Sequence, residues 1–191
     1  MPLILASASP RRAELLRNAG IAFTVEPARI REEPRLHEPP LEYAQRLARD
    51  KARAVFVHNF DNMVLGADTV VVVGEHLLEK PRQKADAARM LHLLSGRTHQ
   101  VITGVCLVAP GHEQTEAEVT EVRFSVLSDN EIDAYIRTLE PMDKAGAYAI
   151  QGIASRWVER IDGCYFNVVG LPVSRVYRML NGLEAKTGMR H

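Results

Sequence analysis

The segment Ser7–Arg12 combines hydroxyl and guanidinium groups in the order Ser-Ala-Ser-Pro-Arg-Arg, directly after the apolar run Leu3–Ala6. The apolar run predicts a buried strand, and Ser9 followed by a proline is typical of a helix start. The N–H groups and dipole of such a start favour anions, so these side chains would suit a phosphate. The alternative is that Ser9 only caps the helix while Arg11 and Arg12 are solvated. Two cations in a first turn oppose the dipole, which favours an external anion.

A second candidate is the pair Asp68 and Thr69, which stands between the apolar runs Met63–Ala67 and Val70–Val73. We interpret the two runs as strands and the pair as a break between them. A carboxylate at such a break could bind Mg²⁺ or orient a water molecule. The alternative is an aspartate that only caps a turn.

Lys51 is the third candidate, because it interrupts the apolar stripe of a helix predicted over Glu42–His58. The stripe has three- and four-residue spacing, which places its members on one helix face. A lysine that points into a core needs a partner, unless its stem is buried and its charge reaches water. The stripe is compatible with either a buried partner or a charge that reaches water.

Two further segments hold polar side chains in backbone settings that favour contact with a ligand. Lys80 precedes a proline, which holds it extended and would present its ammonium group to a phosphate. Asp143–Gly152 is rich in small residues, so its backbone could approach a ligand while Gln151 offers an amide to a base edge. A plain basic loop and a glycine-tolerant turn are the respective alternatives.

The elements that must position these groups alternate between strands and helices. Over Pro27–Pro40, prolines and charged residues interrupt the hydrophobic periodicity of helices and strands, which predicts an extended loop. Loops of this length often have a function. The remaining expected elements are a first helix ended by Gly20, a helix over Lys84–Leu94, strands over Val101–Val108 and Val119–Val126, a capping-box helix from Ser128 to Leu139, and a last helix from Pro172 to Gly182. The two long strands flank a Pro110-Gly111 turn, which favours an antiparallel pair and a mixed sheet. The pattern predicts one α/β domain over residues 1–183 and a loose tail over 184–191.

Composition excludes several classes of protein. The 191 residues carry 24 Lys and Arg against 24 Asp and Glu, so the net charge of zero speaks against a nucleic-acid or acidic-membrane binder. Cys106 and Cys164 lack metal-ligand spacing, which predicts reduced thiols and a cytoplasmic protein. We find no signal peptide and no run of 18 apolar residues, so we expect an untargeted, soluble chain.

Common catalytic motifs are also missing. The sequence has no GxxxxGK[ST], GxGxxG or GxSxG pattern. A covalent aspartyl-phosphate on Asp68 would require a second aspartate two residues later, where Val70 stands.

Several motifs, taken in order, closely resemble the Maf family over about residues 3 to 180. They are Leu5–Arg12, Arg46–Ala52, Gly66–Val71, Leu78–Pro81, Leu94–Gly96, Asp143–Tyr148, Ile150–Gly152 and Val169–Pro172. The resemblance implies an inosine-triphosphatase-like fold, with a mixed, strongly twisted sheet flanked by helices and a cleft between two lobes. It implies a nucleoside triphosphate pyrophosphatase that uses Mg²⁺ or Mn²⁺ and releases a monophosphate and pyrophosphate.

The resemblance also implies roles for individual residues. Asp68 is the expected proton acceptor, and Arg11, Thr69 and Gln151 are associated with base choice. Further polar site positions fall on Ser7, Arg12, Glu32, Lys51 and Lys80. Asp68 and Glu32 are the expected metal ligands, although Arg31 precedes Glu32-Glu33 where family members usually carry an acidic pair, so Glu33 also stays a candidate.

The Ala-Tyr-Ala-Ile-Gln-Gly version at residues 147–152 is similar to the subgroup that acts on dTTP and UTP. Modified pyrimidine nucleotides are a further expected substrate, and the resemblance implies a homodimer. The balanced charge predicts no nucleic-acid or membrane partner. Two rival functions remain. One is a nucleotide-sensing regulator of septum formation without turnover, and the other is a phosphatase that removes the terminal phosphate.

Overall fold

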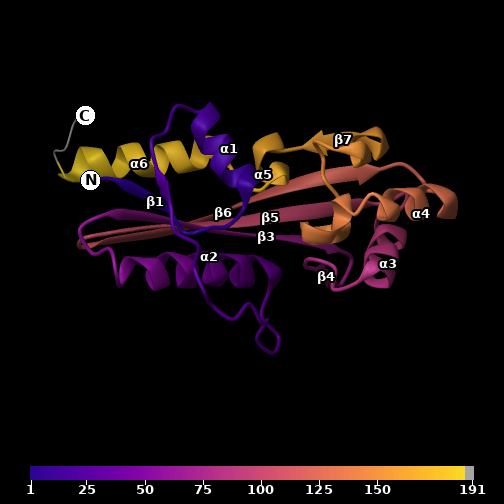
Figure 1. Cartoon of the computed structure of the whole chain (residues 1–191), viewed down its shortest axis with the longest axis horizontal. Helices are drawn as coiled ribbons and strands as arrows, with labels where there is room; N and C mark the ends of the chain where they lie inside the picture. Colours follow the sequence, from indigo (N-terminus) through magenta and orange to yellow (C-terminus); the bar gives the residue numbers. More distant parts are fainter. Residues whose placement is uncertain (188–191) are drawn as a thin grey trace. The chain divides into compact units, whose positions relative to one another are not determined.

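The structure, a computed structural model, describes residues 1–187 (Figure 1). The strands are β1 (Leu3–Leu5), β2 (Thr24–Val25), β3 (Met63–Val73), β4 (His76–Leu78), β5 (Thr98–Ala109), β6 (His112–Phe124) and β7 (Val158–Asp162). The helices are α1 (Pro10–Asn18), α2 (Pro40–Phe56), α3 (Lys84–Leu94), α4 (Asp129–Arg137), α5 (Tyr165–Val169) and α6 (Val173–Thr187). Short 3₁₀ turns cover Glu140–Asp143, Ala145–Ala147 and Ile153–Trp157.

Within residues 1–187 the strands form one seven-stranded sheet in the order β2-β1-β3-β5-β6-β7, with β4 paired to β3. Strand β1 is parallel to β2 and β3, whereas β4 is antiparallel to β3 and β7 is antiparallel to β6. The predicted mixed sheet with flanking helices is therefore confirmed. Strands β5 and β6 are joined by Pro110 and Gly111 alone, a connection that only antiparallel neighbours can make.

The chain forms two compact units. Unit 1 holds Met1–Asp68, Thr103–Glu118 and the described residues from Gly170 to Thr187, and unit 2 holds Thr69–Ile102 and Val119–Val169. Strands β3, β5 and β6 each contribute residues to both units. The single domain expected over residues 1–183 stays a prediction.

In unit 1, α2 lies on one side of the strands and α1 and α6 lie on the other (Figure 1). Helix α2 approaches closely because two glycines face it. A Cβ at Gly66 would overlap the carbonyl oxygen of Ala48, and one at Gly104 would overlap the backbone of Ala44. Ala44 and Ala48 are four residues apart and fully buried, so a small-residue face of α2 lies directly on β3 and β5.

We expect Gly66→Ala to destabilise the protein by about 2 kcal/mol or more, because the added methyl group must displace backbone rather than a side chain. Urea unfolding followed by circular dichroism measures this. Gly182→Ala is the matched control, because Gly182 lies inside α6 with open space around it. That control should stabilise by about 0.5–1 kcal/mol, as alanine does in a helix interior. Equal stabilities of the two variants would contradict the close approach.

Four expectations about the elements were wrong or incomplete. Strand β3 runs without a break through Asp68 and Thr69, so this pair lies inside a strand rather than in a turn between two. Helix α6 continues past Gly182 to Thr187, so the predicted tail begins inside a helix, and residues 188–191 lie outside the described part. Ser9 precedes α1 but makes no side-chain cap. The short elements β2, β7 and α5 were not predicted.

In unit 2, α3 packs against α4 and the 3₁₀ turns at Glu140–Asp143 and Ala145–Ala147 (Figure 1). The predicted capping box of α4 is present, since Ser128 Oγ accepts from the Glu131 N–H and the Glu131 carboxylate accepts from the Ser128 N–H. Buried aromatic rings form the core here. The His99 and Tyr148 rings each meet Phe124 edge to face, at centroid distances of 4.9 and 4.8 Å.

His99 makes this core sensitive to acid. The residue is 2% exposed, its Nε2 lies 2.9 Å from the Tyr148 hydroxyl, and its Nδ1 has no hydrogen-bond partner among residues 1–187. Burial lowers the pKa of His99 from its usual 6.5 to about 4. The unfolded chain therefore binds a proton below pH 6.5 that the folded chain binds only near pH 4.

We expect His99 to reduce the free energy of unfolding by roughly 3 kcal/mol as the pH falls from about 6.5 to 4, at about 1.4 kcal/mol per pKa unit. Its contribution is fully restored above pH 6.5. His99→Gln cannot titrate and should lose less stability over this range, as measured by urea unfolding at several pH values. If the free energy of unfolding of His99→Gln fell with pH as steeply as that of the wild type, His99 would not be the cause of the acid sensitivity.

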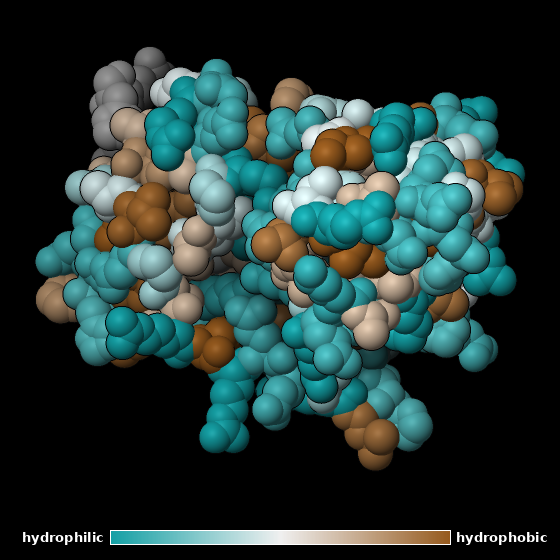
Figure 2. Space-filling view, turned by 45° about the vertical axis from the view of Figure 1, so that its right-hand side comes forward, coloured by the Kyte–Doolittle hydropathy of each residue, from teal (hydrophilic) through white to brown (hydrophobic). Residues whose placement is uncertain are grey.

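The face in Figure 2 is mainly hydrophilic, with separate apolar spots rather than one continuous patch. Among residues 1–187, none of the helices combines the length and the apolar character needed to cross a membrane.

Candidate functional site

The centre of the candidate site in unit 1 is the ammonium group of Lys51. Its Nζ donates to Asp68 Oδ1 at 2.6 Å and lies 2.9 Å from Glu32 Oε1. Lys51 is 8% exposed and Asp68 is 6% exposed, whereas the Glu32 side chain is 44% exposed. Lys51 therefore has a buried partner, and the alternative that its charge reaches water is wrong.

The same close approach that shapes the core brings Lys51 to Asp68. Lys51 lies one turn after Ala48 on α2, and Asp68 lies two residues after Gly66 on β3, so the Asp68 side chain points to the strand face on which Gly66 meets α2. Because the α2 backbone lies against Gly66, Lys51 spans the remaining distance to the carboxylate. Glycine at position 66 thus positions the ion pair.

Burial raises the pKa of the Asp68 carboxyl, while the positive charges of Lys51 and Arg12 act in the opposite direction. A carboxylate whose pKa lies above its usual range is a stronger base than one in water. Asp68 therefore has the environment that a proton acceptor requires.

Arg12 is tied to the protein rather than solvated. Its Nη1 donates to Ser7 Oγ at 3.1 Å and to the Ala67 carbonyl at 2.9 Å, and its Nε donates to the Gly170 carbonyl at 2.8 Å. Burial lowers the pKa of this guanidinium. These acceptors give the cation internal partners, so the argument that first-turn arginines require an external anion does not hold for Arg12. Arg11 is half-buried at the same helix start.

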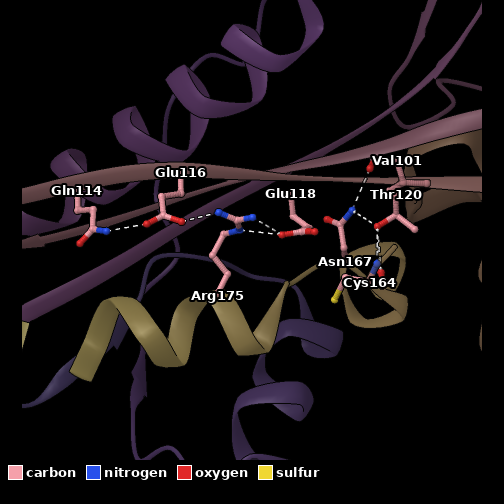
Figure 3. Close-up of polar contacts among 8 residues, drawn as sticks. All are labelled: Val101, Gln114, Glu116, Glu118, Thr120, Cys164, Asn167 and Arg175. Carbon is pink, nitrogen blue, oxygen red and sulfur yellow. Dashed lines mark hydrogen bonds and ion pairs between the residues drawn. The ribbon is translucent and has the colours of Figure 1, made fainter. Parts of the chain in front are cut away.

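The carbonyl of Gly170 lies just before α6, and an ion cluster holds this helix on β6. Figure 3 shows the Arg175 guanidinium between Glu116 and Glu118, with Nη1 2.6 Å from Glu116 Oε2 and Nε 2.8 Å from Glu118 Oε2. Because the contact is forked, it fixes the orientation of α6 as well as its position.

Figure 3 also shows how α5 is held within unit 2. Asn167 is fully buried, and its Nδ2 donates to the Val101 carbonyl at 2.9 Å and to Thr120 Oγ1 at 3.0 Å. Thr120 Oγ1 in turn donates to the Cys164 carbonyl and accepts from the Cys164 N–H. These bonds fasten the start of α5 to β5 and β6.

Arg46 fixes the loop that carries Glu32, a role that sequence reasoning missed. Its Nε and Nη2 donate to the two carboxylate oxygens of Glu38 at 2.6 and 2.7 Å, and Nη2 also donates to the Glu33 carbonyl at 3.0 Å. The hydrogen bond from Arg46 lowers the pKa of Glu38 to about 2. The Glu33 backbone is thus held by α2 while the Glu32 side chain reaches Lys51. Arg46 stands beside the apolar stripe of α2, but nothing in its spacing marks a partner in the loop.

We expect Arg46→Lys to lower kcat/KM about tenfold, because a lysine cannot form the fork and the loop with Glu32 loosens. Steady-state kinetics of the purified variants measures this. Arg53→Lys is the matched control, since Arg53 on the same helix forms an exposed fork with Glu113 of β6 rather than with the loop. Equal activity of both variants would contradict the positioning role.

The remaining predicted residues belong to unit 2. Thr69 is half-buried on β3, Lys80 is exposed after β4, and Gln151 is exposed in the turn before Ile153–Trp157. The Glu79 carbonyl accepts from the Gly146 N–H at 3.1 Å, so the segments that carry Lys80 and Gln151 are hydrogen-bonded neighbours. Of the predicted positions, the structure brings Ser7, Arg12, Glu32, Lys51 and Asp68 together in unit 1.

Asp68 and Glu32 are the carboxylates of this site that could bind a divalent cation. Within residues 1–187 no group of three or more His, Cys, Asp or Glu side chains could hold a metal ion by itself. Asp68 and Glu32 nevertheless converge on one point, the Lys51 ammonium. Mg²⁺ is commonly held by one or two carboxylates together with substrate phosphates, and this pair fits that mode.

The chain is similar to several known proteins. A dTTP/UTP pyrophosphatase of Koribacter versatilis (strain Ellin345) is 61% identical over 180 residues, which cover 94% of this chain and 93% of that protein. A protein of the same name from Bacillus pumilus (strain SAFR-032) is 48% identical over 178 residues, covering 93% and 94%. A solved HAM1 protein from Coxiella burnetii is 17% identical with a TM-score of 0.42, over 77% of this chain and 86% of that chain. The Maf family model, described as Maf-like protein, matches residues 2–183. The chain belongs to the Maf family.

Proposed function

We propose that this protein is a nucleoside triphosphate pyrophosphatase that hydrolyses dTTP and UTP to the monophosphate and pyrophosphate. The observation that carries the proposal is the buried Asp68 carboxylate, paired with Lys51 and flanked by Glu32. The proteins from Koribacter and Bacillus support it, because their names state this activity at 48–61% identity over nearly the whole chain.

In the proposed reaction, water attacks the α-phosphorus while Asp68 accepts its proton. The bond from the α-phosphorus to the oxygen that bridges to the β-phosphorus breaks, and pyrophosphate leaves. Lys51 neutralises negative charge on the phosphates from within a partly dry site, where a charge acts more strongly than in water. Arg12 keeps the Ser7 hydroxyl and the Ala67 backbone in place.

A divalent cation would be held by Asp68 and Glu32 together with the substrate. When bound, such an ion neutralises charge on phosphate oxygens. We assign the site glutamate to Glu32 rather than Glu33, because Glu32 lies at Lys51 while Glu33 offers its carbonyl to Arg46. Lys80 is proposed as a second phosphate contact, and Arg11, Thr69 and Gln151 are proposed to choose the base.

The test is to incubate the purified protein with dTTP, UTP, CTP or GTP plus Mg²⁺ and to resolve the products. We expect monophosphate and pyrophosphate, formed fastest from dTTP and UTP. Inorganic phosphate with a diphosphate would replace the proposal by a terminal phosphatase. Binding without turnover would replace it by the nucleotide-sensing regulator of septum formation. The cytoplasmic location and the homodimer stay predictions, and the latter is tested by analytical ultracentrifugation.

A further inference from the structure

The turn that carries Gln151 is held at both ends by one polar cluster in unit 2. At its start, the Ala149 N–H donates to the Tyr135 hydroxyl at 3.1 Å. Just after its end, the Ile153 N–H donates to Glu140 Oε1 at 3.1 Å. Between these points the Gly152 N–H donates to the Ala149 carbonyl at 3.0 Å, which closes the turn around Gln151.

The two holding groups also bind each other. The Tyr135 hydroxyl donates to Glu140 Oε1 at 2.9 Å, so one carboxylate oxygen receives both the tyrosine and the Ile153 N–H. Glycine at position 152 is required for this, because a Cβ there would overlap the Glu140 carboxylate. We call Tyr135 and Glu140 the turn clamp.

Buried aromatic rings hold Tyr135 of the turn clamp in place. Tyr135 is 1% exposed on α4, and its ring meets the Trp157 ring edge to face at 5.0 Å. Trp157 Nε1 donates to Glu131 Oε1 at 3.2 Å, and Glu131 is the carboxylate that closes the capping box of α4. The start of α4 and the turn are thus joined through buried rings, whereas the Gln151 side chain itself is exposed.

We propose that Tyr135 and Glu140 are positioning residues that set the base preference of the enzyme by fixing the turn of Gln151. The inference rests on the proposed function, in which Gln151 contacts the base. An amide discriminates between bases only when its donor and acceptor are held in place, since a mobile amide can turn to satisfy either pattern. Neither clamp residue touches the base; they act through the backbone of the turn.

The main variant is Tyr135→Phe, which removes the hydroxyl and keeps the ring. We expect kcat/KM for UTP to fall roughly three- to tenfold, the effect of one hydrogen bond, and kcat/KM for CTP to change less. The loss should lie in KM rather than kcat, because the turn binds the base and takes no part in the chemistry. Glu140→Gln keeps an acceptor oxygen and should preserve the preference, whereas Glu140→Leu should lose it.

Tyr165→Phe is the matched control, because Tyr165 lies in the same unit on α5, outside the turn, and is 41% exposed. It should leave the ratio of UTP to CTP turnover unchanged. If Tyr135→Phe does not fold, Gly152→Ala displaces the Glu140 carboxylate while both clamp residues remain. Hydrogen exchange of the amides of residues 149–153 gives a readout without substrate and should accelerate in Tyr135→Phe and Glu140→Leu only.

An active wild type whose base preference survives Tyr135→Phe and Glu140→Leu would overturn this inference alone. Unchanged amide exchange in both variants would also overturn it. A wild type that hydrolyses neither dTTP nor UTP would instead overturn the proposed function, and the role in base preference with it.

Discussion

Replacing Asp68 by asparagine should lower kcat by about 10²- to 10⁴-fold, the usual effect of losing a positioned base. An amide cannot accept the proton of the attacking water. It still offers an oxygen to Lys51 Nζ, which also keeps its contact with Glu32, so the variant should remain folded. Pyrophosphate release from UTP at saturating substrate measures the effect, and circular dichroism verifies the fold.

Asp61→Asn is a suitable control for this prediction, because Asp61 is an exposed aspartate two residues before β3. It should keep wild-type turnover. If Asp68→Asn also retained near-normal turnover while folded, Asp68 would have no part in the chemistry, and the mechanism proposed above would have to be abandoned.

Lys51→Met should lower kcat by roughly 10²- to 10³-fold, about 2.7–4 kcal/mol of transition-state stabilisation, as when one preorganised charge partner is removed. The methionine fills the space of the lysine stem but leaves Asp68 and Glu32 without the cation between them. Two neighbouring carboxylates then repel each other, and a buried charge without a partner costs stability, so the unfolding midpoint in urea should fall as well.

Lys51→Arg separates charge from geometry, since the guanidinium keeps the charge but not the compact shape of an ammonium group. It should retain more activity than Lys51→Met. Lys84→Met is the control, because Lys84 is exposed at the start of α3. If Lys51→Met kept full turnover, Lys51 would contribute to the stability of the fold and not to catalysis.

The candidate residues could be proposed before the fold was known because their types conflict with their surroundings. Lys51 stands on an apolar stripe and Asp68 among buried strand residues, and each conflict indicates a partner. The partner itself was not predictable, because Lys51 and Asp68 are 17 residues apart and lie on different elements. The break expected at Asp68 was wrong for a related reason. Local polarity indicates a turn, but β3 pairs with β1 before Asp68 and with β4 after it, which keeps the strand extended.

The amino-acid sequence by itself determined the alternation of helices and strands, the capping box at Ser128 and the identity of the polar groups, since these depend on neighbours within a few residues. Only the tertiary structure decided which groups meet. Arg46 reaches the backbone beside Glu32, Arg12 reaches the Gly170 carbonyl 158 residues away, and Tyr135 and Glu140 hold the turn of Gln151. Such contacts depend on how closely two backbones pack, and that distance is set by long-range packing rather than by local spacing.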